Sequence, residues 1–293
     1  MKLFYLIFCI LFSQNMLTLE TEKVDEQPTK CAYAVLTQPS KITCSKEDYT
    51  TKDLKRCNHK GDSRKEYFHN CQGSRQYKNP TATYIGQFQH NQPNGEGFLK
   101  GNEAQYRGFF KDGLKHGLGK AVTYNKLITM GWWVNGRANG MVEEQTPEML
   151  YIGNMVNGVK NGHGAAVTQN LGEGNFTYVG YWNDDRFDGE GKLEFKEAGI
   201  TMSGNFKDGN LHGKGMVISP EAVYTGEFNN SLFDGEGVLI TYDLESDETI
   251  KSIQDGFFKD GKFLNDVCSK LGFKPETLDF SKCLLDLMNP NNN

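Results

Sequence analysis

YVGYW at residues 178–182, followed by DGEG at residues 188–191, decides the fold, because the same two phrases recur along most of the chain. The first phrase is Tyr-x-Gly-x-aromatic, and the second is a small polar residue followed by Gly-x-Gly. From residue 84 to residue 263, the leading glycines of the two phrases are always nine residues apart, as are Gly180 and Gly189. Successive units are 22 to 27 residues apart. Constant spacing within units and variable spacing between them are typical of a solenoid-like repeat.

Alternation along residues 178–182 predicts a β-strand with two different faces. A period of two places Tyr178, Gly180 and Trp182 on one face, and Val179 and Tyr181 on the other. The glycine between two rings predicts a socket for an aromatic side chain from the adjacent hairpin. Because the chain has 33 glycines and its apolar residues are mostly isolated, we expect an all-β fold without a deep globular core.

Asn, Asp or His occupies the position before the leading glycine of the second phrase in all seven units. The seven residues are Asn94, His116, Asn139, Asn161, Asp188, His212 and Asp234. These residue types tolerate a left-handed backbone and favour turns, so the position is interpreted as a turn. His116 and His212 are therefore expected to be structural. His163 is the variable residue of a Gly-x-Gly and is expected to face outward.

The units resemble MORN repeats, as YIGQFQHNQPNGEG at residues 84–97 and YTGEFNNSLFDGEG at residues 224–237 illustrate. The resemblance covers seven units and a degenerate eighth, QDGFFKDGKF at residues 254–263. It implies an elongated single-sheet array of β-hairpins over residues 84–263. Unit three, at residues 129–142, lacks the leading Tyr and the second glycine, while units four and six have Met155 and Met202 at repeat positions. We expect the edges of these units to pack less regularly, while the flanking units keep the sheet in register.

The N-terminus has the pattern of a secretory signal peptide. Met1-Lys2 precedes an apolar run from Leu3 to Phe12, which is too short to span a bilayer. We assign residues 1–19 to the signal, with cleavage between about residues 13 and 23. An uncleaved anchor is the alternative. The protein is expected to be secreted or extracytoplasmic, in the periplasm or at the cell surface if the source is bacterial.

Six cysteines remain after the signal, and none lies within the repeats. They are Cys31, Cys44, Cys57, Cys71, Cys268 and Cys283. An even number in an exported chain favours disulfides, although the sequence leaves 15 pairings open. Nearest neighbours are our prediction: Cys31 with Cys44, Cys57 with Cys71, and Cys268 with Cys283. A zinc site is the rival interpretation, but no Cys-x-x-Cys and no His at ligand spacing support it.

Both flanks are interpreted as caps of the array. Residues 24–83 show no sustained period, and we expect a loop-rich, disulfide-held N-terminal cap. Residues 264–288 have apolar residues at helical spacing, including Leu264, Val267 and Leu271, which predict a short helical hairpin over the last repeat. Residues 289–293 are expected to be a disordered tail. FHNCQGS at residues 68–74 is similar to leaders of bacterial MORN proteins, and the tail from Cys268 to Cys283 resembles short tails of exported bacterial proteins.

Charge and motifs exclude several classes of function. Residues 84–293 carry 19 basic and 28 acidic side chains, a poor match for nucleic acid or anionic lipid. The glycine pairs recur in every unit and lack the strand-to-helix context of a nucleotide site, so no cofactor is expected. No metal cluster and no catalytic residues stand out from the repeat pattern. Asn175 and Asn229 begin glycosylation sequons, which matter only if the source glycosylates.

These observations predict a non-catalytic scaffold that presents aromatic and acidic side chains to a protein or cell-envelope partner. Phe109, Trp132 and Tyr181 fall on the strand face opposite the socket glycines and are the candidate contact residues. Two alternatives remain. Resemblance to MORN proteins allows a membrane-associated tether that contacts phospholipid, although the acidic array disfavours direct membrane binding. The other is an enzyme in the cysteine-rich leader that uses a free thiol.

Overall fold

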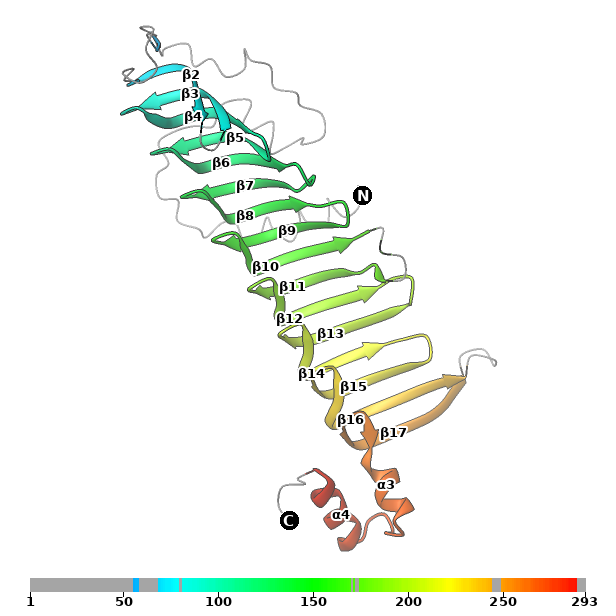
Figure 1. Ribbon diagram of the computed structural model, residues 1–293. Helices are drawn as coiled ribbons and strands as arrows, with labels where there is room; N and C mark the ends of the chain where they lie inside the picture. The colour runs from blue at the N-terminus through cyan, green and yellow to red at the C-terminus, as the bar shows by residue number, and fades with distance from the viewer. Residues whose placement is uncertain are drawn as a thin grey trace, which may run out of the picture. The chain divides into compact units, whose positions relative to one another are not determined.

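The structure is a computed structural model, which describes residues 55–57, 68–78, 81–169, 171, 174–243 and 249–288. All described strands belong to one 18-stranded sheet, whose strands follow one another in chain order (Figure 1). From β2 to β18 each strand pairs antiparallel with the next, and β1 pairs parallel with β2. The predicted signal at residues 1–19, the tail at residues 289–293, Cys31 and Cys44 lie outside the described residues.

The elements have the following bounds. The first strands are β1 (Lys55–Arg56), β2 (Cys71–Lys78), β3 (Thr81–Gln89), β4 (Gln92–Gly101), β5 (Ala104–Lys111), β6 (Leu114–Thr123), β7 (Ile128–Val134), β8 (Arg137–Gln145) and β9 (Met149–Val156). The later elements are β10 (Val159–Thr168), β11 (Thr177–Asn183), β12 (Arg186–Phe195), β13 (Ile200–Lys207), β14 (Asn210–Ile218), β15 (Ala222–Asn229), β16 (Leu232–Asp243), β17 (Thr249–Lys259), β18 (Lys262–Phe263), α3 (Leu264–Lys270) and α4 (Leu278–Met288). The all-β class and the repeat hairpins are as predicted.

Each repeat is a hairpin closed by a two-residue turn in which both residues have positive φ. Asp184 and Asp185 form the turn between β11 and β12, with φ of 46° and 63°. Such turns match the twist of the strands that they join. The interpretation of the position before Gly-x-Gly as a turn is therefore wrong. Asp188 lies within β12, and the next residue, Gly189, takes the positive φ of 102° in a bulge that the register shift opposite Tyr181 reveals.

The tip of each hairpin is hydrogen-bonded to the preceding repeat. In the turn between β13 and β14, the Gly209 amide donates to the Phe187 carbonyl at 2.8 Å. The Gly261 amide donates in the same way to the Phe233 carbonyl at 2.9 Å. These bonds satisfy backbone groups that strand pairing leaves open, and they connect each unit to its neighbour.

One face of the sheet, here called the tyrosine face, carries the leading Tyr of the repeats and contains the core. The ring of Tyr178 lies across Gly180 and Gly191, where an added Cβ would approach its hydroxyl to 2.5 and 2.4 Å. The hydroxyl donates a hydrogen bond to the Tyr181 carbonyl at 2.9 Å. The expectation that a neighbouring hairpin fills the glycine socket is therefore wrong, because the repeat's own tyrosine occupies it.

Aromatic residues connect successive repeats along the tyrosine face. The ring of Trp182 packs edge-on against Tyr178 of its own unit and Tyr151 of the preceding unit, with centroids 5.3 Å apart in both cases. Its indole Nε1 donates to the Gly164 carbonyl at 3.2 Å. Phe187, a residue outside the two phrases, stacks on Tyr178 at 3.7 Å. Burial of these rings supplies the apolar contacts between units.

The irregular third unit is packed as closely as its neighbours. Thr129 replaces the leading Tyr, and Val142 replaces the second glycine, directly opposite Gly131. Val142 is only 2% exposed, as is Met155 of unit four. The smaller Thr129 leaves the space that Val142 occupies, so the two departures compensate each other. The prediction of less regular packing is wrong for these residues.

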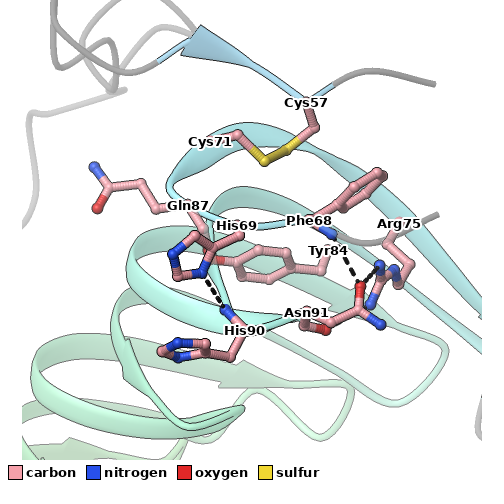
Figure 2. Close-up of a disulfide and its surroundings, with 9 residues drawn as sticks. All are labelled: Cys57, Phe68, His69, Cys71, Arg75, Tyr84, Gln87, His90 and Asn91. Atoms are coloured by element: carbon pink, nitrogen blue, oxygen red, sulfur yellow. Dashed lines mark hydrogen bonds between the residues drawn. A yellow bond between two sulfur atoms is a disulfide. The ribbon is translucent and has the colours of Figure 1, made fainter.

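The sheet begins earlier than Tyr84, where the sequence places the start of the array. β2 lies within the predicted cap at residues 24–83. Its sequence hides the repeat pattern, because Cys71 stands opposite Phe88 at a position where the repeats have glycine. Figure 2 shows the disulfide between Cys57 and Cys71 and, farther down, the Asn91 side chain, which accepts from the Phe68 amide at 3.2 Å. Phe68 thus takes the place of a preceding repeat at this end.

The other end is covered by α3 and α4, as predicted for residues 264–288. Asn265 of α3 lies over Gly256, where an added Cβ would be 2.9 Å from its Oδ1. Gln254 of β17 donates to Asp266 at 3.3 Å. The disulfide between Cys268 and Cys283 joins the two helices next to buried Phe280. Both described disulfides are nearest-neighbour pairs.

Alkaline pH is expected to destabilise the array, because burial raises the pKa of the tyrosines at the socket positions, including Tyr178. For Tyr224, burial and the nearby Glu227 raise the pKa to about 12. Since the ordinary pKa is about 10, unfolding releases protons, and this stability is present below pH 10 but lost as pH rises toward 12. Melting temperature measured against pH should fall above about pH 10. Tyr224→Phe should reduce the slope, and an unchanged slope would contradict this origin.

Candidate binding groove

The three candidate contact residues lie on the face opposite the tyrosine face, here called the groove face. Tyr181 is 45% and Trp132 43% exposed, whereas Phe109 is half-buried. Each lies beside the positive-φ glycine of the next strand: an added Cβ on Gly189 would be 3.0 Å from the Cβ of Tyr181. The bulge therefore determines where these side chains stand.

An open groove with a volume of about 1120 Å³ crosses the groove face from β10 to β17. Its floor is formed by glycines that lie opposite one another in six consecutive strands. These are Gly180, Gly191, Gly204, Gly215, Gly226 and Gly237. Because side chains alternate along a strand, the residues on either side of each glycine point to this face and form two walls.

One wall begins with a pair of rings. His163 of β10 is exposed, as expected, and packs against Tyr181 of β11 with ring centroids 4.1 Å apart. Farther along, this wall carries Glu190, Lys214 and Glu227. The wall therefore changes from aromatic to charged along its length.

The opposite wall consists mainly of small or apolar side chains. It contains Val179, Ser203, Met216, Thr225 and Val238. Lys192 and Asp255 are the charged residues that line the groove on this side. Small side chains leave the glycine floor accessible from solvent.

Carboxylates outnumber lysines among the groove residues. The groove is lined by four carboxylates and two lysines, namely Glu190, Glu227, Glu236 and Asp255, and Lys192 and Lys214. Lys192 forms an ion pair with Glu194, and Lys214 stands in register opposite Glu227. The groove is therefore acidic, because Glu194 offsets the charge of Lys192 and only Glu227 has a groove lysine opposite it.

The structure separates the three predicted contact residues. Tyr181 lines the groove, whereas Phe109 on β5 and Trp132 on β7 lie outside it. Sequence reasoning missed the carboxylates and the second wall. One usable signal was residue size: the position before the first glycine is Ser203 or Thr225 in later units but Arg107 or Met130 in earlier ones.

In the described ranges, no group of three His, Cys, Asp or Glu side chains is placed to hold a metal ion. No helix in the same ranges is long and apolar enough to cross a membrane. Outside the groove, burial raises the pKa of Glu143, and the nearby Lys120 partly offsets this effect.

Comparison with known proteins identifies the repeat. The MORN repeat family model matches residues 84–102, 106–125, 151–165, 178–197, 203–220 and 224–243. The unit with Thr129 and Val142 is not matched, in keeping with its two replacements. A search of curated proteins found no match. The spacing, the hairpins and six matches to the family model together show that the chain is a MORN-repeat protein.

Proposed function

We propose that this protein is an exported, non-catalytic scaffold that binds a protein partner in the groove between β10 and β17. The observation that carries this proposal is the glycine-floored groove, which is open to solvent and lined by aromatic, small and charged side chains from eight consecutive strands. Recognition sites combine accessible apolar surface with a few placed polar groups.

Export is supported by two features. The signal-like pattern at residues 1–19 precedes cysteines, and Cys57–Cys71 and Cys268–Cys283 are disulfide-bonded. Disulfides persist in oxidising compartments such as the periplasm and the extracellular space. We therefore place the scaffold outside the cytoplasm, with the partner in the same compartment.

A protein partner fits the groove better than a phospholipid surface. Anionic headgroups would approach Glu190, Glu227, Glu236 and Asp255, which would repel them. Vesicle flotation gives a direct comparison, since a phospholipid tether requires retention of the full chain on anionic vesicles.

Blocking the groove is expected to abolish partner capture. Thr225 is exposed in the wall on β15, so Thr225→Trp would place a large ring over the glycine floor without changing charge. The full, disulfide-bonded chain would be used to capture proteins from its own extracytoplasmic fraction. A partner retained by wild type should be lost by Thr225→Trp.

Ile85→Trp is the matched control, because Ile85 precedes the first glycine of its unit but lies outside the groove. It should retain the partner. Equal capture by both variants would refute the groove as the binding site, and circular dichroism would establish that both remain folded.

A further inference from the structure

The length of the groove floor suits an extended polypeptide. Adjacent strands are about 4.8 Å apart, so the glycines from Gly180 on β11 to Gly237 on β16 span about 24 Å. An extended chain advances about 3.4 Å per residue, and about seven residues would cover this distance. The segment would lie across the strands, with alternate side chains directed toward the same wall.

The carboxylates of the charged wall have a spacing that an extended chain can match. Glu190 is on β12 and Glu227 is on β15, three strand spacings or about 14 Å away. Four residues of an extended chain cover nearly the same length, and residues four apart lie on the same side. None of the ion pairs in the described part of the chain uses Glu190 or Glu227.

The neighbours of these two carboxylates distinguish the ends of the site. Tyr181 lies on β11, the strand next to that of Glu190, and its ring packs against His163. A guanidinium can pair with the carboxylate while it stacks on a ring. Glu236 and Asp255 extend the acidic surface beyond Glu227. Lys214 on β14 stands between the two ends and would repel a cation placed midway.

We propose that the groove binds an extended segment of the partner with two basic residues four positions apart and no basic residue between them. Arginine would lie at the Tyr181 end, and lysine or arginine beside Glu227. This inference rests on the proposed function and adds to it the charge, conformation and spacing of the bound segment.

Two isomeric peptides test the spacing. The probes are labelled serine peptides of about nine residues with two arginines, either four or three positions apart. Only the first isomer presents both arginines to one wall. Fluorescence anisotropy with the full chain should show at least about fivefold tighter binding of the first isomer, with weakening at high salt.

Charge variants test the location. Glu190→Gln combined with Glu227→Gln should weaken the first isomer about tenfold or more. Glu148→Gln combined with Glu221→Gln removes the same charge from exposed positions outside the groove and should leave binding unchanged. Equal loss in both double variants would show non-specific charge attraction and overturn the assigned site.

Equal affinity for the two isomers, or binding of neither, would overturn the inference. The proposed function would still stand if Thr225→Trp abolished partner capture while Ile85→Trp did not. If capture survived Thr225→Trp, the proposed function would fail whatever the peptides did, so the two failures are distinguishable.

Discussion

Gly191→Val is expected to destabilise the array by about 3 kcal/mol. Even the first added carbon would lie 2.4 Å from the Tyr178 hydroxyl and 2.7 Å from its ring. The ring is fully buried and its hydroxyl is hydrogen-bonded to the Tyr181 carbonyl, so it has little room to move. Urea denaturation followed by circular dichroism would measure the change in unfolding free energy.

The third unit shows how this cost can be offset. Tyr178→Thr combined with Gly191→Val reproduces the pairing of Thr129 with Val142. Tyr178→Thr alone should cost about 3 kcal/mol through the lost ring, yet the double variant should be more stable than the sum of the single costs by at least about 1 kcal/mol. Strictly additive costs would refute compensation. Gly174→Ala, which meets nothing closer than 3.9 Å, is the near-neutral control.

The repeat pattern was sufficient to predict the sheet but not its contacts. A period of two correctly separated Tyr178 from Tyr181, because strand geometry alone decides which face a side chain points to. It could not decide whether the ring over Gly180 came from the same strand or the next. That choice depends on side-chain direction and hydrogen bonding, which spacing does not specify.

Turn chemistry was ambiguous for a related reason. Each repeat offers Asn, Asp or His at two places, as Asp184 and Asp188 illustrate, and both places precede residues that favour tight backbone geometry. The turn falls at Asp184 and Asp185, whereas Asp188 lies in a strand before a bulged glycine. Only the pairing register of β11 with β12 separates these two cases.

The candidate site was predicted in part. Tyr181 was a candidate because the period of two places it on the strand face opposite the socket glycines, and it lines the groove. Glu190 and Glu227 were not, since acidic residues are frequent throughout the array and nothing in the sequence distinguishes these two. They become neighbours of one groove through the register of consecutive strands.

Removal of the Cys268–Cys283 disulfide, by alanine at both positions, is expected to destabilise the C-terminal cap by about 3 kcal/mol. The bond closes a segment with a sequence separation of 15, and both cysteines are buried. In the chain-entropy model, the cross-link limits the freedom of the unfolded cap. Loosening α3 would withdraw Asn265 from Gly256 and uncover the outer edge of β17.

Hydrogen exchange resolves this effect along the chain, because neighbouring repeats can open separately. Exchange should rise in α3, α4 and β17, while β3 to β6 keep their protection. The matched double variant, Cys57→Ala with Cys71→Ala, should produce the reverse pattern, since that bond joins β2 to the residue after β1. Unchanged protection of β17 would show that the helices cover the edge without the bond, and a uniform rise along the whole sheet would show that the cap does not act locally.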